Sequence, residues 1–177
     1  MGVTTMIIYV ICDSRRWEPY IFCYFLGNNP EHRAAAKELA RETGKKIVAL
    51  RHLDQYVPED EQFGDYAPYD VDPVRFLNIL RNADYVCTDS FHGMAFSVLC
   101  EKQFLVFNRY SDTASHSKNS RIESVCQNLQ LENRRYFFDR DLREAIDTPI
   151  DYQNVRILVQ QYREQTKDYL QKALMEK

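Results

Sequence analysis

The alternation of short apolar runs with helix-forming stretches is the feature that most constrains the fold of this chain. Each of four apolar runs has the length of a buried strand, and a stretch with helical spacing or helix-capping signals separates each run from the next. The runs are residues 20–26, 47–50, 85–87 and 103–107. This order predicts an α/β fold: a mainly parallel sheet, covered by helices on both faces, with right-handed crossovers.

The first crossover carries clear start and stop signals. Asn29 followed by Pro30 is typical of an N-cap with proline at the first helical position, and Gly44 is placed to end the helix. The turn before it, at Gly27 and Asn28, opens a helix N-terminus toward solvent and could bind an anion. An ordinary tight turn with a good cap explains the same residues equally well.

The 177-residue length fits one domain with a substantial core. We expect an N-terminal extension at residues 1–19 that could add a strand, an α/β domain at 20–147, and a C-terminal helix within 148–177 that packs on the same domain. The apolar run at 6–12 is far shorter than the roughly 20 residues of a membrane span, and it has no basic region before it. We therefore predict no membrane span.

Charge and cysteine content narrow the classes of partner and location. The net charge of −3 gives no global electrostatic reason to expect nucleic acid or an anionic membrane as a partner. The five cysteines are odd in number, widely spaced and mostly within apolar runs, which indicates reduced, buried thiols and a cytoplasmic location. No cysteine or histidine cluster has the spacing of a metal site.

The stretch at residues 84–100 combines a buried strand, a polar turn and an apolar helix. Asp89 or Ser90 can cap this helix, whose first N–H groups, near Gly93, would favour an anion. His92 falls in the turn, where an imidazole could pair with an anion and exchange a proton near neutral pH. The structural alternative is also common, because many α/β proteins have such a turn and a single histidine there is often only a surface residue.

Three polar turns directly follow strands of the predicted sheet: Gly27 with Asn28, residues 88–93, and Asn108 with Arg109. In parallel sheets of this type, ligands bind at the carboxyl ends of the strands. We therefore expect the three turns to meet at one edge and to form one site.

Two further features lie outside these turns. The segment 51–71 has little periodicity and is long for a connection, which is typical of functional loops. Ser120 and Glu123 have the spacing of a capping box, so Ser120 has a structural explanation. Arg121 would then lie in the first helical turn, unfavourably placed against the helix dipole, and so has a better claim to bind an anion.

The string at residues 83–97, Ala-Asp-Tyr-Val-Cys-Thr-Asp-Ser-Phe-His-Gly-Met-Ala-Phe-Ser, resembles the signature of the polysaccharide pyruvyl transferase family. Segments 24–27, 73–77 and 119–122 stand in the order and spacing of that family, so the resemblance covers roughly residues 20–145. It implies a Rossmann-like domain similar to the C-terminal half of a type B glycosyltransferase fold. Since only residues 1–19 precede the first matching strand, we expect the corresponding N-terminal half to be missing.

The resemblance implies transfer of a pyruvyl group from phosphoenolpyruvate to a sugar of a cell-surface polysaccharide, forming a ketal without a metal or other cofactor. Phosphoenolpyruvate and a saccharide acceptor would be the ligands. His92 would be the general acid, while Asp89 would orient its imidazole or cap the helix. The implied substrate-binding residues are Arg109 and Arg121, together with Gly27, Asn28, Ser90, Gly93, Asn108 and Ser120.

Two other functions stay open at this point. The same helix start could bind the diphosphate of a nucleotide-sugar in a glycosyltransferase-like domain. Alternatively, the chain could be a non-catalytic half that requires a partner. Such a half would expose its former interface, an apolar, tyrosine-rich face with Tyr66, Tyr69 and residues 6–12, and a homo-oligomer could cover it. A base-stacking pocket would favour the nucleotide, whereas two arginines converging beside His92 would favour phosphoenolpyruvate.

Overall fold

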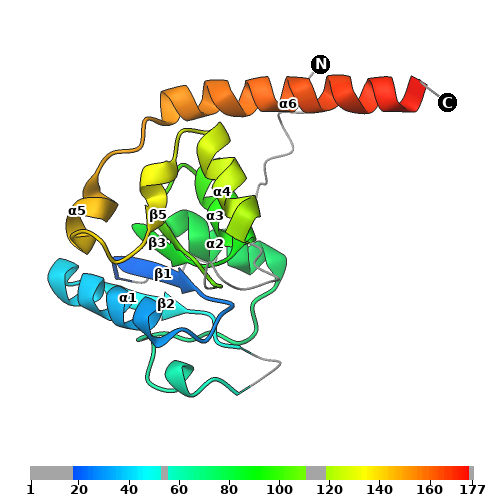
Figure 1. The fold of residues 1–177 in the computed structure, drawn as a ribbon. Helices are drawn as coiled ribbons and strands as arrows, with labels where there is room; N and C mark the ends of the chain where they lie inside the picture. The colour runs from blue at the N-terminus through cyan, green and yellow to red at the C-terminus, as the bar shows by residue number, and fades with distance from the viewer. Residues whose placement is uncertain (1–17, 53–55, 111–118, 176–177) are drawn as a thin grey trace.

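The computed structural model describes residues 18–52, 56–110 and 119–175, and their centre is a five-stranded sheet (Figure 1). Every strand pair is parallel, and the strand order is β2-β1-β3-β4-β5. The α/β prediction, with a single Rossmann-like domain, is confirmed. The strands are β1 (Tyr20–Tyr24), β2 (Lys46–Ala49), β3 (Tyr85–Thr88), β4 (Gln103–Phe107) and β5 (Arg135–Tyr136).

Both faces of the sheet are buried, because the central strands are apolar at consecutive positions. Phe22 of β1 pairs with Val48 of β2 and Val86 of β3, and Val86 pairs with Phe104 of β4; all four side chains are fully buried. This face is covered by α2 (Pro73–Asn82), α3 (Phe91–Leu99) and α4 (Asn119–Asn128). The opposite face is covered by α1 (Pro30–Thr43) and α5 (Leu142–Asp147).

Local signals mark both ends of α1, as predicted, and the start of α2. Asn29 Oδ1 accepts a hydrogen bond from the N–H of Glu31 at 2.9 Å, and Pro30 is the first helical residue. Gly44 ends α1 with φ at +66°, in the left-handed region that glycine adopts without strain. At α2, Asp72 Oδ1 accepts from the N–H of Arg75 at 2.7 Å.

The capping box predicted at Ser120 and Glu123 is wrong. Helix α4 already includes Asn119, so Ser120 lies inside the helix rather than at its cap. Glu123 does not reach back to the helix start; its Oε1 pairs with Arg135 Nη1 at 3.1 Å. Glu123 therefore forms an ion pair with a residue beyond the helix instead of the hydrogen bond of a capping box.

The described residues of segment 51–71 are partly structured and lie beside the sheet. It contains a short 3₁₀ turn, η2 (Pro58–Asp60), and an isolated bridge between Val48 and Tyr66 that extends the edge at β2. The sequence did not predict α5, nor the 3₁₀ turn η3 (Glu132–Arg134) before β5. Residues 6–12, where a strand was expected, lie outside the described part of the chain.

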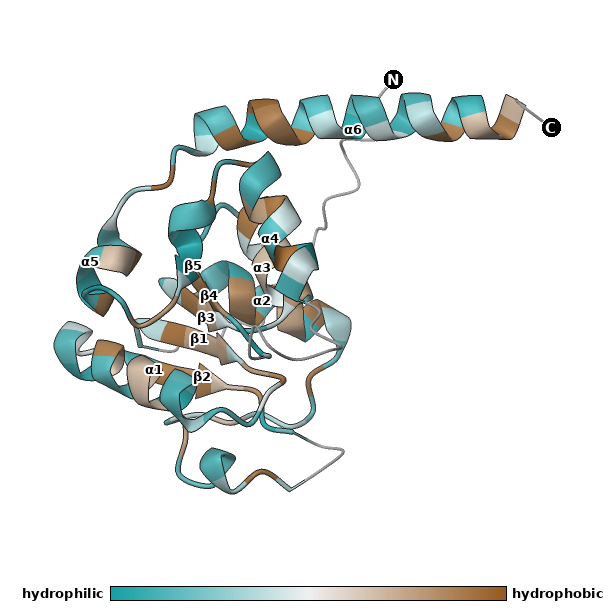
Figure 2. Ribbon diagram, viewed as in Figure 1, coloured by the Kyte–Doolittle hydropathy of each residue, from teal (hydrophilic) through white to brown (hydrophobic). Residues whose placement is uncertain are grey.

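The last helix, α6 (Tyr152–Met175), packs on the domain only through its beginning. Val155 is buried, and Tyr152, Leu158 and Val159 pack against the same core cluster. From Gln160 onward the described residues are exposed, and α6 extends past the body of the domain with teal and brown bands along its length (Figures 1 and 2). Across the described ranges, no helix has the length and apolar character needed to cross a membrane.

The described cysteines are free thiols. Cys23, Cys87 and Cys126 are buried and Cys100 is half-buried, whereas Cys12 lies outside the described residues. Burial raises the pKa of the Cys126 thiol to about 12, so this thiol stays protonated and behaves as a small apolar side chain.

Candidate functional site

Three turns meet at the carboxyl edge of the sheet, as the sequence predicted. Strands β1, β3 and β4 are adjacent, with Tyr24 paired to Thr88 and Thr88 paired to Val106. The turns that follow these strands therefore lie side by side. They carry Gly27, Asp89 and Arg109, respectively.

Asp89 connects the three turns. Its Oδ1 accepts a hydrogen bond from the N–H of Leu26 at 2.7 Å, and its Oδ2 accepts from the N–H of Gly27 at 2.9 Å. Arg109 Nε lies 3.7 Å from Oδ1, and Arg109 Nη2 donates to the carbonyl oxygen of Asp89 at 3.3 Å. The Asp89 side chain is fully buried, so these contacts replace water completely.

The Asp89 carboxyl is held in its anionic form. Burial alone would raise its pKa, but contact with the His32 ring, the N–H of Leu26, the charge of Arg109 and the N–H of Gly27 more than offset that effect. Its pKa is therefore lowered from the usual value. An anionic carboxylate with these partners positions the turns and does not donate a proton at neutral pH.

The cap of α3 is Ser90, which decides one alternative that the sequence left open for Asp89. Ser90 Oγ accepts from the N–H of Gly93 at 3.4 Å, and Thr88 Oγ1 accepts from the N–H of Ser90 at 3.0 Å. A Cβ added to Gly93 would lie 2.4 Å from Thr88 Oγ1. Gly93 is therefore required for the close approach of α3 to the end of β3.

His92 is the second residue of α3, so it lies in the first helical turn rather than in the preceding turn where the sequence placed it. Its side chain is exposed, and its ring meets that of Phe91 edge-on, with centroids 5.8 Å apart. Within the described residues, His92 has no hydrogen bond or ion pair. Asp89 forms no hydrogen bond or ion pair with His92 there; the imidazole beside the Asp89 carboxylate is that of His32, whose Nδ1 lies 3.7 Å from Oδ2.

Arg109 and Arg121 border one small pocket at the start of α3. The Arg121 guanidinium lies 5.4 Å from the centre of the Phe91 ring, so α4 delivers this arginine to the first turn of α3. Arg109 lies 5.7 Å from the centre of the Tyr110 ring. The lining residues are Asp89, Phe91, Arg109, Tyr110, Asn119, Arg121 and Ile122.

The other predicted binding residues differ in their positions. Gly27 is part of the site, because an added Cβ would lie 2.8 Å from Asp89 Oδ2 and 3.0 Å from Arg109 Cγ. Asn28 is exposed beside it. Asn108 turns toward the edge of the sheet, where its Oδ1 accepts from Arg135 Nη2 at 3.4 Å. Ser120 is exposed on α4, next to Arg121.

Sequence reasoning missed His32, which is almost completely buried against the site. Its Nδ1 lies 3.7 Å from Asp89 Oδ2, and its ring centre lies 4.9 Å from that of Phe107. The spacing of His32, Ala35, Ala36 and Leu39 on α1 could have placed this histidine on the buried face.

A second network, also missed, lies behind the turn at Gly27. Arg33 donates from Nε and Nη2 to Asp60 Oδ1 at 2.8 and 2.7 Å, while its Nη1 donates to the carbonyl oxygen of Gly27 at 3.0 Å. Asp60 Oδ2 accepts from the backbone N–H of His52 at 3.2 Å and lies 2.8 Å from its ring Nδ1. No group of three potential metal ligands occurs among the described histidine, cysteine, aspartate and glutamate residues.

A comparison with known protein families matches the part of the chain that carries most of the candidate site. The family described as polysaccharide pyruvyl transferase matches residues 5–111, which is more than half of the chain. The matched span contains β1 to β4 and the turns that carry Gly27, Asp89 and Arg109, while Arg121 lies beyond it. A search of curated proteins gave no match.

Proposed function

The chain belongs to the polysaccharide pyruvyl transferase family, and we propose that it transfers the pyruvyl group of phosphoenolpyruvate to a sugar of a cell-surface polysaccharide. One observation carries this proposal: Arg109 and Arg121 border a single pocket at the start of α3, the helix whose first turn exposes His92.

The pocket has the charge that phosphoenolpyruvate requires. This donor carries a phosphate and a carboxylate, and guanidinium groups bind both with paired hydrogen bonds. The N-terminal end of α3 adds the positive end of a helix dipole. The negative charge of Asp89 does not oppose the ligand strongly, because the N–H groups of Leu26 and Gly27 and the charge of Arg109 already compensate it.

His92 is the proposed general acid. Its imidazole, protonated beside the bound phosphate, would protonate the methylene carbon and convert it to a methyl group while positive charge develops at the neighbouring carbon. One sugar hydroxyl adds to that carbon and loses its proton. A second hydroxyl then displaces the phosphate, also losing its proton, so the products are a cyclic ketal and inorganic phosphate.

The alternative with a nucleotide-sugar has less support. Two arginines converge on one pocket at the start of α3, which is the feature that favours phosphoenolpyruvate. The pocket volume of about 20 Å³ holds only a water-sized group, so the donor would extend beyond the pocket rim. His92 and Arg121 are exposed at the rim, so we include in the proposal a second domain or partner chain that closes over them and presents the acceptor.

Calorimetric titration of the chain with phosphoenolpyruvate, and in parallel with a panel of nucleotide-sugars, tests the anion site. We expect phosphoenolpyruvate to bind more tightly. Arg109→Ala and Arg121→Ala should each weaken its binding by about tenfold, as expected for loss of one charged hydrogen-bonding group, whereas Arg163→Ala on the exposed part of α6 should not. Unchanged affinity in both site variants, or tighter binding of a nucleotide-sugar, would refute the proposal.

A further inference from the structure

The backbone of Gly27 is held on both sides. Its N–H donates to Asp89 Oδ2 at 2.9 Å, and its carbonyl oxygen accepts a hydrogen bond from Arg33 Nη1 at 3.0 Å. The same Nη1 atom donates to the carbonyl oxygen of Asn29 at 3.1 Å, so Arg33 spans the turn between β1 and α1. A carboxylate therefore fixes this turn through its N–H groups, and a guanidinium fixes it through its carbonyl oxygens.

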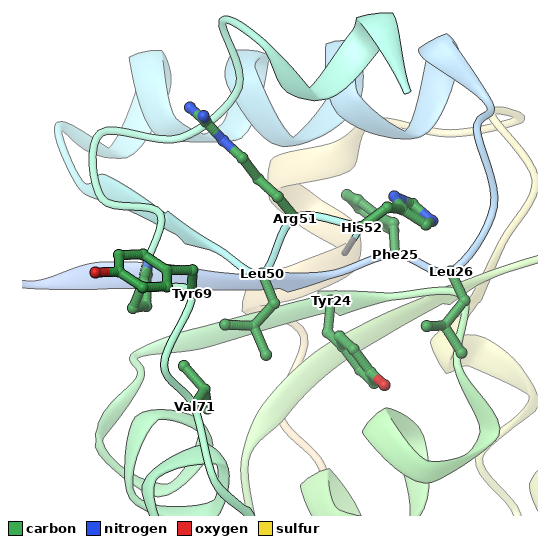
Figure 3. Close-up of a pocket in the computed structure, with 9 residues that line it drawn as sticks. Tyr24, Phe25, Leu26, Leu50, Arg51, His52, Tyr69 and Val71 are labelled. Carbon is green, nitrogen blue, oxygen red and sulfur yellow. The ribbon is translucent and has the colours of Figure 1, made fainter. Parts of the chain in front are cut away.

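Asp60 fixes the orientation of Arg33. The arginine is only 3% exposed, and its Nε and Nη2 atoms both donate to Asp60 Oδ1, at 2.8 and 2.7 Å. The other oxygen of Asp60, Oδ2, lies 2.8 Å from Nδ1 of His52. Figure 3 shows that the His52 ring points away from Leu50 and Tyr69, which line the neighbouring cavity. Because a guanidinium is planar, these contacts direct the remaining Nη1 atom of Arg33 toward the turn.

Charges of alternating sign lead from this network to the anion pocket. Burial alone would raise the pKa of Asp60, but the hydrogen bonds from His52 and Arg33 lower it below the usual value. Asp60 and Asp89 are therefore both carboxylates, each beside a guanidinium, that of Arg33 or that of Arg109. An anion bound at Arg109 would continue the alternation.

The position of Gly27 determines that of Arg109. A Cβ added to Gly27 would lie 2.8 Å from Asp89 Oδ2 and 3.0 Å from Arg109 Cγ, so both side chains pack directly on the glycine. Arg109 in turn lies beside Asp89, with Nε 3.7 Å from Oδ1 and Nη2 donating to the carbonyl oxygen at 3.3 Å. A shift of the Gly27 backbone would therefore move the stem of Arg109 together with the carboxylate that its guanidinium faces.

Stability of α1 does not explain why an arginine occupies position 33. Arg33 is the fourth residue of α1, where a positive charge is unfavourable to the helix dipole. Its guanidinium also lies 5.7 Å from the centre of the Phe25 ring and 5.9 Å from that of Phe63. Apolar residues often replace a buried ion pair in such surroundings without loss of stability. An apolar side chain would not hold the carbonyl oxygens of the turn.

We propose that Arg33 is a positioning residue for the anion pocket, because it holds the carbonyl side of Gly27 and thereby keeps Arg109 in place for the ligand. Asp60 orients Arg33 from behind. Neither of them is among the described residues that line the pocket. The identity of the ligand, phosphoenolpyruvate, rests on the proposed function.

The experiment compares the same substitution at two buried arginines. Arg33→Lys keeps the positive charge, but an ammonium group lacks the planar fork that contacts Asp60 and the turn together. The matched control is Arg134→Lys: Arg134 is fully buried and its Nη1 donates to the carbonyl oxygen of Thr148 at 3.1 Å. Arg134 directly precedes β5, at the opposite edge of the sheet from the site. Both variants should lose stability, but calorimetry should show phosphoenolpyruvate affinity lowered only in Arg33→Lys, by about tenfold, as for one weakened charged hydrogen bond.

Nitrogen-15 NMR separates positioning from stability without any ligand. Arg109 Nε is buried and, in the described part of the chain, has no hydrogen-bond partner, so its resonance should respond to its distance from Asp89. We expect the Gly27 amide and Arg109 Nε resonances to shift in Arg33→Lys and to keep their parental positions in Arg134→Lys. An unmoved Arg109 resonance in Arg33→Lys would refute the positioning role, as would parental affinity for phosphoenolpyruvate in that variant when the parent binds it.

The parent protein provides a second test that requires no folded variant. Energetic coupling between two positions is reciprocal, so phosphoenolpyruvate bound at Arg109 should also shift the Gly27 amide and Arg33 Nε resonances. If the ligand shifts Arg109 alone, the turn is not coupled to the pocket and the positioning role is refuted. If the parent binds no phosphoenolpyruvate while Arg33→Lys still shifts the Arg109 resonance, the proposed function fails and the positioning role stands.

Discussion

The Nδ1 atom of His32 lies 3.7 Å from Oδ2 of Asp89, and both side chains are almost completely buried. This contact joins the first turn of α1 to the turn after β3, at the centre of the edge where the candidate site lies. At this distance the contact is electrostatic rather than a hydrogen bond. Asp89 thus organises the site through the turns on either side of it.

Replacing Asp89 should destabilise the whole domain. In Asp89→Asn the amide can still accept one hydrogen bond, but its NH₂ group would face an N–H donor of Leu26 or Gly27, and Arg109 would lose its countercharge. Removing one partner of a buried charged network costs about 3–5 kcal/mol in the free energy of unfolding. Urea denaturation would measure it, with Asp139→Asn at an exposed position as the control. A loss equal to that of the control would contradict the role of Asp89.

The loss of unfolding free energy caused by Asp89→Asn should depend on pH. Because the pKa of Asp89 is lower in the folded protein than in the unfolded chain, the folded state binds fewer protons, and the stabilisation is fully present above the unfolded pKa of about 4. It is lost as pH falls through the folded pKa. The difference in unfolding free energy between parent and variant should therefore shrink between pH 5 and more acidic conditions, provided both remain folded. A difference that stays constant over this range would show that the carboxylate charge is not the source of the stability.

Two glycines give a matched pair for the site geometry. Gly27→Ala would place a Cβ 2.8 Å from Asp89 Oδ2 and 3.0 Å from Arg109 Cγ, so we expect both side chains to shift and phosphoenolpyruvate affinity to fall by about tenfold or more. Gly44→Ala meets no atom within 4 Å and has only the strain of a positive φ, about 1 kcal/mol. Binding titrations should separate the two variants even where their melting temperatures fall equally. A normal affinity in Gly27→Ala would indicate that the anion does not depend on this contact.

The sheet and the convergence of the turns could be predicted because they depend on local signals and on a general rule of topology. Asn29, Pro30 and Gly44 mark the ends of α1 within the chain itself. Once the strands are parallel, the turns after β1, β3 and β4 must lie at one edge.

Two local interpretations differ from the structure for one physical reason. In each case a partner that is distant in sequence took the place of the expected local partner. Glu123 pairs with Arg135 instead of capping its own helix. The imidazole beside Asp89 comes from α1 rather than from the neighbouring His92. Spacing within one element carries no information about partners that the fold brings together from other elements.

His92→Gln is the most direct test of the proposed chemistry. His92 is exposed in the first turn of α3, where neither the core nor a described hydrogen bond depends on its ring, so the variant should keep the stability of the parent. Glutamine keeps a polar side chain but has no proton that can be transferred at neutral pH. Loss of a general acid typically lowers the rate by about 10²–10⁴-fold, whereas Arg109 and Arg121 still provide the charge that binds phosphoenolpyruvate.

The measurement is release of inorganic phosphate in the presence of a saccharide acceptor, with calorimetric affinity for phosphoenolpyruvate determined on the same samples. Because only a protonated imidazole can act as the acid, parental turnover should fall as pH rises, and the variant should lose this dependence. Arg121→Ala should show the opposite pattern, because its affinity for phosphoenolpyruvate should fall before its maximal rate does. Equal turnover in His92→Gln and the parent would assign the proton transfer to another group.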